Sequence, residues 1–184
     1  MVDRKINAIL INDRIIVWDI ENAKKLYKNG FYGKYVGIRK ARELEIDRPL
    51  ELSLIEACYL VERGILRVID VNGNEITFDK LIELANKYYE NFNDVYVVYK
   101  DLKKRGYIVK SGLKFGTVFA VYEHGPGIDH APFLVHILPF KERLDPLEII
   151  RAGRLSHSVR KKFVIATIEP GSRKIRYFIF KWFG

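Results

Sequence analysis

Cysteine is almost absent from this chain of 184 residues, which contains only Cys58. A single cysteine excludes an internal disulfide bond and any zinc site built from several thiolates. Cys58 lies within the apolar, helix-like pattern of residues 54–60, which predicts a buried structural thiol rather than a nucleophile.

Long hydrophobic runs are also missing. Phe133 to Leu138 is among the longest, whereas a helix needs about 20 apolar residues to cross a bilayer. No apolar signal region follows the first residues, because Asn12-Asp13-Arg14 interrupts the apolar pattern there. We therefore expect a cytoplasmic protein without a membrane partner.

Acidic residues are in deficit. The chain has 23 Asp and Glu against 32 Lys and Arg, which gives a formal net charge of +9. The excess is concentrated in residues 151–181, where nine basic residues accompany the single acid Glu169. Positive charge attracts polyanions at long range, so nucleic acid or an acidic surface is the expected partner.

Periodicity and turn signals predict an α+β protein in two halves that meet near Asn91-Phe92-Asn93-Asp94. Residues 1–91 form a small N-terminal α/β domain with hairpins and helices, and residues 92–184 a C-terminal α/β domain with a mixed central sheet. Gly30 is expected to end the first helix, and Asp94 to cap the fourth. Helices are expected at residues 19–29, 53–63, 77 or 79 to 90, 94–102, and 145–151 or further. Strands are expected at residues 8–10, 14–17, 50–52, 66–70, 75–77, 107–111, 114–115, 118–122, 133–138, 163–168 and 175–182.

A tyrosine, a histidine and a lysine in the second half suit RNA chemistry. Tyr122 ends a predicted strand, His130 follows the turn Gly125-Pro126-Gly127, and Lys161 belongs to a basic run. Metal-free cleavage of RNA by internal attack needs a base for the 2′-hydroxyl, an acid for the departing 5′-oxygen and a cation for the phosphate. Histidine exchanges protons near neutrality and suits the acid. A phenol, whose ordinary pKa is about 10, needs nearby positive charge to act as a base.

Each of these residues alone has an ordinary explanation. The chain has 11 tyrosines, which are expected mostly to pack, and a lysine in a basic run is usually surface charge. His124, His136 and His157 compete with His130, and Lys162 competes with Lys161. The residues by themselves leave these alternatives open.

Three motifs follow one another within residues 93–168. They are Gly106-Tyr107-Ile108-Val109-Lys110-Ser111-Gly112-Leu113-Lys114-Phe115-Gly116 with Val121-Tyr122, His130 with Phe133-Leu134-Val135 behind it, and Ser156-His157-Ser158-Val159-Arg160-Lys161. Together they resemble the core of the archaeal tRNA-splicing endonucleases, the tRNA-intron lyases. The N-terminal half resembles that family only in length, order of elements and a few phrases.

The resemblance implies roles for five residues. Tyr122 would be the general base, His130 the acid and Lys161 the cation, with no metal and no other cofactor. Arg154 lies seven residues before Lys161 and Arg176 fifteen after it. By the same resemblance, these two arginines would sandwich a bulged base through cation–π contacts and so bind the RNA.

The resemblance also implies a substrate and an assembly. The family cuts precursor tRNA at bulge–helix–bulge motifs, and two cuts at a fixed separation need two active sites in a symmetric dimer or tetramer. The apolar strand at residues 175–182 could pair across a two-fold axis, although it suits the interior of a monomer equally well. In the self-sufficient form of the family an acidic loop joins the subunits, but here Glu169 stands against Arg173 and Lys174. We therefore expect a homodimer that completes a heterotetramer with a second subunit, with a homotetramer as the alternative.

Two other functions compete with this interpretation. One is a non-catalytic RNA-binding or structural subunit of the same assembly. The other is a metal-dependent DNA nuclease, because the α-β-β-β order of the C-terminal half suits a restriction-endonuclease-like fold. Such enzymes hold Mg²⁺ with clustered carboxylates. The acids between residues 107 and 168 include no Asp followed by a Glu-x-Lys motif.

Overall fold

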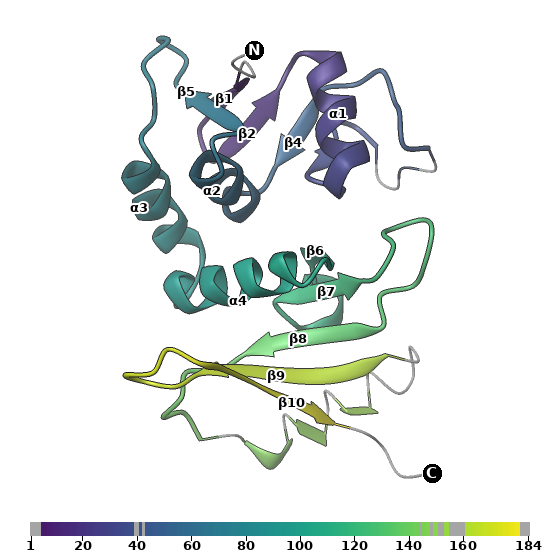
Figure 1. Ribbon diagram of the computed structural model, residues 1–184, viewed down its shortest axis with the longest axis vertical. Coiled ribbons are helices and arrows are strands. Elements are labelled where there is room, and N and C mark those ends of the chain that lie inside the picture. The colour runs from purple at the N-terminus through teal and green to yellow at the C-terminus, as the bar shows by residue number, and fades with distance from the viewer. Residues whose placement is uncertain are drawn as a thin grey trace. The chain divides into compact units, whose positions relative to one another are not determined.

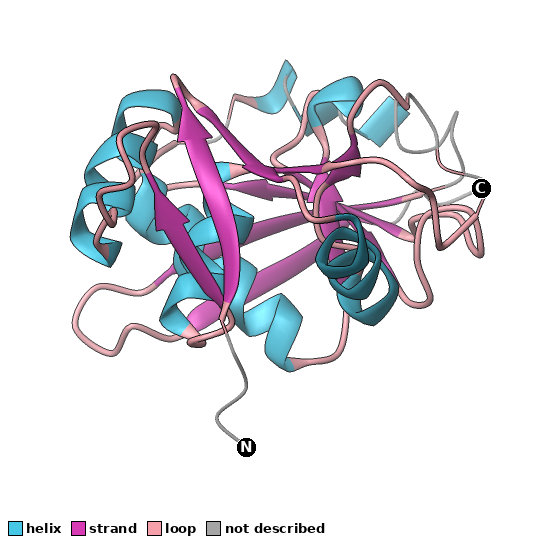
Figure 2. Cartoon of the chain, turned by 90° about the horizontal axis from the view of Figure 1, so that it is seen from above, coloured by secondary structure: helices cyan, strands magenta, loops and turns pink. Residues whose placement is uncertain are grey.

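The computed structural model describes residues 5–38, 41, 43–143, 145–147, 149–150, 153–154 and 161–180. The chain forms two compact units, residues 1–92 and 93–184. Each unit contains helices and one mixed β-sheet, as the α+β prediction requires (Figures 1 and 2). Among the described residues, no helix is both long and apolar enough to cross a bilayer.

The N-terminal unit is built on a sheet in the order β3-β4-β2-β1-β5. Only the β1–β5 pair is parallel. Asn12, with a φ of 57°, lies in the turn between β1 and β2. The strands are β1 (Ile6–Ile11), β2 (Arg14–Val17), β3 (Lys34–Tyr35), β4 (Leu50–Leu52) and β5 (Leu66–Ile69), and the helices are α1 (Ile20–Gly30), α2 (Leu54–Glu62) and α3 (Phe78–Tyr88). The strand expected at residues 75–77 is reduced to a single bridge between Ile69 and Glu75.

The helices of this unit begin at side-chain caps. Ser53 and Glu56 form a capping box at the start of α2, and Thr77 caps α3. The end of α1 differs from the prediction, because Gly30 stays helical and Phe31 adopts the left-handed conformation, with a φ of 53°. Phe31 is buried and packs edge-on against Tyr27, so the burial of its ring offsets the steric cost of about 1–2 kcal/mol.

The C-terminal unit has a sheet in the order β10-β9-β8-β7-β6, in which only β8 and β9 are parallel. Its elements are α4 (Phe92–Lys104), β6 (Ile108–Ser111), the 3₁₀ turn η1 (Leu113–Phe115), β7 (Phe119–Tyr122), β8 (Phe133–Ile137), β9 (Lys162–Ile168) and β10 (Ile175–Phe180). Four of the described residues from 146 to 150 are helical, as are Gly153 and Arg154. The rest of the helix expected from residue 145, and residues 181–182 of the last strand, lie outside the described residues.

Two predictions for this unit are wrong. The strand expected at residues 114–115 is the 3₁₀ turn η1, because the chain reverses between Gly112 and Gly116, which has a φ of 65°. Helix α4 begins at Phe92, so Asp94 lies in its first turn rather than at its cap. Asn91, with a φ of 53°, makes the preceding turn and allows the fully buried Phe92 to begin the helix.

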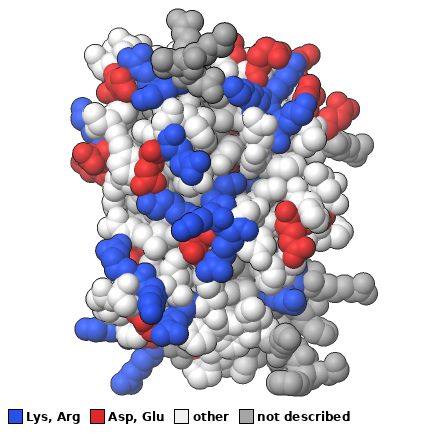
Figure 3. All heavy atoms as spheres, viewed as in Figure 1, with Lys and Arg blue, Asp and Glu red and all other residues white. Residues whose placement is uncertain are grey.

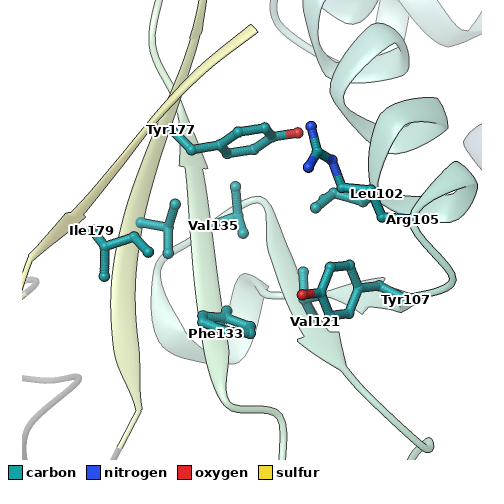
Figure 4. A pocket seen from close by; sticks show the side chains of 9 residues that line it. Leu102, Arg105, Tyr107, Val121, Phe133, Val135, Tyr177 and Ile179 are labelled. Carbon is teal, nitrogen blue, oxygen red and sulfur yellow. The ribbon is translucent and has the colours of Figure 1, made fainter.

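Side chains of the second sheet alternate between two faces. One face carries a buried cluster of Ala120, Leu134, Phe163 and Ile165, with Tyr122 packed against it. The other face borders α4 and contains a pocket of about 210 Å³ (Figure 4). This pocket is lined by Leu102, Arg105, Tyr107, Val121, Phe133, Val135, Val164, Tyr177 and Ile179.

Candidate active site

The sheet register places Tyr122 and Lys161 at the same end of the sheet. Val121 pairs with Phe133 on β8, and Phe133 pairs with Lys162 on β9. The next position along each strand therefore brings Tyr122 and Lys161 to either side of Pro132. Opposite residues share a face, so both side chains project from the face of the buried cluster, with backbones about 10 Å apart, two strand spacings of ~4.8 Å.

Residues 123–130 form a tight loop that is organised by the carboxylate of Asp129. Its Oδ2 atom accepts hydrogen bonds from the backbone amides of Glu123 (3.1 Å) and His124 (3.0 Å), and its Oδ1 atom accepts one from Gly125 (2.8 Å). Gly125 and Gly127 have φ angles of 126° and 96°, which strain any residue with a Cβ atom. The loop is thus folded by its own hydrogen bonds just before it reaches His130.

Lys161 is hydrogen-bonded to the chain beside His130. Its Nζ donates to the carbonyl oxygen of Ala131 at 2.7 Å, and it lies 5.6 Å from the ring centre of Phe115. His130 itself is exposed, whereas Ala131 is buried. The structure therefore brings together the lysine and the loop that carries the histidine, on the same side of β8 as Tyr122.

Burial changes the proton affinities of two of these groups in opposite directions. Burial lowers the pKa of Lys161, and the negative charge of Asp129 opposes that effect. Burial raises the pKa of Tyr122, and Asp129 raises it further. The expectation that positive charge lowers the pKa of Tyr122 is therefore not met, and at pH 7 the phenol of the chain alone is protonated.

Asp129 keeps its charge although it lies near the partly buried side chains of Tyr122 and Lys161. Desolvation by itself would raise the pKa of Asp129, but hydrogen bonds from the amides of His124, Gly125 and Glu123 outweigh it and lower the pKa. Reasoning from the sequence missed this residue. Its signal was an Asp that follows a Gly-Pro-Gly turn, a position where the side chain can bond to backbone amides.

Two of the competing residues, Lys162 and His136, occupy other surroundings. Lys162 follows Lys161 by one position and so projects from the opposite face, where its Nζ lies 5.4 Å from the ring centre of Phe133. His136 stacks on the ring of Phe163 within the sheet. His124 shares the loop with His130 and is exposed, and His157 lies outside the described residues.

Arg176, one of the two predicted RNA-binding arginines, lies away from Lys161 along the sheet. Arg176 pairs with Thr167, six residues from Lys161 along β9, which is about 20 Å at ~3.3 Å per residue. Its Nε donates to Oε1 of Glu169 at 2.7 Å. Arg154 is exposed in a helical turn.

The described surface carries both basic and acidic side chains. Lys and Arg side chains are spread over much of the face in Figure 3, with Asp and Glu interspersed. Within the described residues, no group of three or more His, Cys, Asp or Glu side chains could hold a metal ion. The pocket of Figure 4 lies on the face opposite Tyr122 and Lys161, so it is separate from their site.

Comparison with known proteins places the chain in a family. Residues 92–177 match the model of the tRNA intron endonuclease catalytic C-terminal domain, and residues 6–82 match that of the tRNA intron endonuclease N-terminal domain. A tRNA-splicing endonuclease of Hyperthermus butylicus is 50% identical over 96% of this chain and 98% of its own length. Proteins with the same name from Pyrobaculum islandicum and Saccharolobus islandicus are 48% and 43% identical, over 91% and 96% of this chain and 93% and 98% of their own lengths.

The chain belongs to the tRNA intron endonuclease family. The match to the catalytic domain and the names of the relatives support tRNA-splicing endonuclease function, and they identify the chain as an enzyme. Tyr122, His130 and Lys161 all lie within the stretch that matches the catalytic domain.

Proposed function

We propose that the chain cuts precursor tRNA at bulge–helix–bulge motifs, without a metal, and leaves 2′,3′-cyclic phosphate and 5′-hydroxyl ends. The observation that supports the proposal is the position of Tyr122 and Lys161 beside the loop that carries His130, at one end of the second sheet. Tyr122 and Lys161 share a face there, and the hydrogen bond from Lys161 to Ala131 holds the His130 loop beside them.

In the proposed reaction the deprotonated form of Tyr122, which is the minor form at pH 7, takes the proton of the 2′-hydroxyl, and the 2′-oxygen attacks the neighbouring phosphorus. The bond from phosphorus to the 5′-oxygen breaks, and His130 donates a proton to that oxygen. Lys161 balances the charge that develops on the phosphate in the transition state. One ammonium proton of Lys161 is bound to Ala131, which leaves two donors for phosphate oxygens.

The edge position of β10 among the described strands supports the proposed homodimer. Strand β10 is the last in its sheet, and its Phe178 and Ile179 side chains are each 53% exposed. An apolar edge strand with free backbone groups is suited to pairing with another chain. A second copy bound along β10 would bury these side chains and give the two active sites that two cuts require.

The loop after β9 supports a heterotetramer over a homotetramer. Its one acid, Glu169, accepts hydrogen bonds from Arg176 at 2.7 Å and from Ser172 at 3.0 Å. A carboxylate already paired within its own chain is a poor ligand for a basic pocket on a neighbour. Gel filtration tests this point, because a chain that is a stable and fully active tetramer by itself would exclude the second subunit.

The remaining parts of the proposal concern position and binding. We assign residues 1–91 to an N-terminal domain and residues 92–184 to the catalytic nuclease domain of a cytoplasmic enzyme. Arg154 and Arg176 are proposed to bind the RNA. Arg176 lies about 20 Å from Lys161 along β9. It is therefore expected to contact nucleotides other than those at the phosphodiester bond whose cleavage Lys161 of the same chain assists.

Cleavage of a bulge–helix–bulge RNA in EDTA tests the function, with and without an added partner subunit. The wild type is expected to cleave, and His130→Ala to be slower by about 10²–10⁴. His124→Ala is the matched control, because His124 uses its backbone amide in the loop, and it should keep wild-type activity. Loss of wild-type activity in EDTA would favour the metal-dependent nuclease. A His130→Ala chain that supports full activity with its partner would favour the non-catalytic subunit.

A further inference from the structure

We propose that Asp129 is a positioning residue of this site, which folds the loop of residues 123–130 and sets His130 beside Lys161. The inference rests on the proposed function and adds to it a fourth residue that does not touch the substrate.

The geometry of the loop carries the proposal. Both oxygens of Asp129 are used, and they collect three consecutive backbone amides from the start of the loop. In the return direction, the amides of Ile128 and Asp129 donate to the carbonyl of Gly125 at 3.1 and 3.0 Å. The two ends of the loop are therefore fastened to each other at Asp129, and the next residue in the chain is His130.

A carboxylate is the group that fits these three donors. It offers two oxygens and no hydrogen, so each amide finds an acceptor. The amide of an asparagine offers one oxygen and an NH₂ group, which would face at least one backbone N–H without accepting its hydrogen bond. A glutamate keeps the charge but moves it outward by one methylene, and the three hydrogen bonds cannot all be made from the same backbone.

The negative charge of Asp129 also affects the pKa values of other side chains in the site. This charge raises the pKa of Tyr122 on β7 and of Lys161 ahead of β9, and the charge of His124 in the loop lowers the pKa of Asp129 itself. Its field raises the pKa of Lys161 and so partly offsets the effect of burial on that ammonium group. Asp129 therefore has two separable contributions, the shape of the loop and the protonation of Lys161.

Two substitutions separate these contributions. Asp129→Asn removes the charge and disturbs the hydrogen bonds, whereas Asp129→Glu keeps the charge and displaces the carboxylate. Asp70→Asn is the matched control, because Asp70 likewise accepts the amides of Asn72 and Asn74, but in a turn of the N-terminal unit. All three variants and the wild type are assayed on the bulge–helix–bulge RNA with its partner subunit.

We expect both Asp129 variants to lower kcat by about 10–100-fold with little change in KM, because a misplaced acid or cation slows the chemical step without weakening binding. Asp70→Asn should match the wild type. The part of the alkaline fall in activity that comes from Lys161 should begin at lower pH in Asp129→Asn, where Lys161 loses its proton more easily, and at the wild-type pH in Asp129→Glu. In a ¹H–¹⁵N spectrum, the amides of residues 123–125 should shift in both variants.

Each failure has its own signature. If the wild type does not cleave the RNA, the proposed function is wrong, and the amide shifts still decide whether Asp129 organises the loop. If the wild type cleaves and both variants stay within about twofold of it, the positioning role is wrong. A thermal melt checks folding. If Asp129→Asn is unfolded, the proposal is tested by the kcat and KM of Asp129→Glu alone. A kcat of Asp129→Glu equal to that of the wild type then overturns the proposal.

Discussion

The ammonium group of Lys161 donates a 2.7 Å hydrogen bond to the carbonyl oxygen of Ala131, thirty residues earlier in the chain. This contact joins the start of β9 to the loop between β7 and β8. It fixes a cation beside the residue that follows His130. The hydrogen bond between this lysine and a backbone carbonyl thus brings together two stretches of the chain, residues 122–131 and the start of β9.

Replacement of Lys161 tests the cation. Lys161→Ala should lower kcat by about 10²–10³, because it removes both the charge at the phosphate and the hydrogen bond to Ala131. Lys162→Ala is the matched control, since Lys162 projects from the opposite face over Phe133, and it should stay close to the wild type. Single-turnover cleavage of the bulge–helix–bulge RNA measures both. Equal losses in the two variants would show that the basic run acts only as a patch of charge.

Replacement of Tyr122 tests the base. Tyr122→Phe keeps the ring that packs against the buried cluster, so the thermal stability should change little. Its kcat should fall by about 10²–10⁴ because the phenol oxygen is lost. Tyr107→Phe is the control, because Tyr107 packs against Phe133 beside the pocket on the other face. Cleavage rates and thermal melts of both variants are the measurements, and a Tyr122→Phe enzyme as fast as wild type would remove Tyr122 from the mechanism.

The pH dependence follows from the lowered pKa of Lys161. The cation Lys161 and the general acid His130 must both be protonated to act, so Lys161 should add its own loss of activity, beyond any that His130 causes, as the pH rises through the pKa of Lys161. That loss should come below the ordinary lysine value of about 10.5. Tyr122 acts when deprotonated and its pKa is raised, so it cannot cause an alkaline loss. Lys161→Arg should be slower yet keep its activity to higher pH, because a guanidinium stays charged.

The loss of activity at high pH is measured from single-turnover rates, corrected for spontaneous hydrolysis of the RNA. If activity falls at the same alkaline pH in wild type and Lys161→Arg, the deprotonation of another group causes the loss.

The edge strand gives a prediction about assembly. Ile179→Glu places a charge on the exposed apolar side of β10 and should convert the proposed dimer to a monomer. Val71→Glu is the control, because Val71 is 70% exposed in a turn of the N-terminal unit and should leave the assembly intact. Analytical ultracentrifugation of both variants measures the result. If wild type and Ile179→Glu are both monomeric, or both dimeric, β10 is not the interface.

Most of the elements could be predicted from local pattern, and the exceptions have local causes that depend on burial. The caps at Ser53 and Thr77 follow from their own side chains. Phe31 ends α1 in place of Gly30 because its ring is buried, and Phe92 begins α4 because it is fully buried. Sequence periodicity does not show which apolar ring packs into the core, so it does not predict the residues at which these helices begin and end.

The candidate catalytic residues could be proposed from the sequence, because they lie in motifs that resemble a family. Their arrangement in space could not be predicted from it. Whether Lys161 or Lys162 faces Tyr122 depends on the β8–β9 register, since a shift of one residue reverses the face. The place of Arg176, six residues away along β9, depends on the β9–β10 register in the same way.

The sequence by itself therefore determined the α+β class, the excess of positive charge and the three residue types that RNA cleavage needs. Tertiary structure alone placed Tyr122 and Lys161 at one end and on one face of the sheet, and showed Asp129 bound to three amides. It also set the direction of the pKa shift of Tyr122, which burial raises although the chain is basic. Charge and motif are properties of the chain, whereas register and desolvation arise only when distant segments pack together.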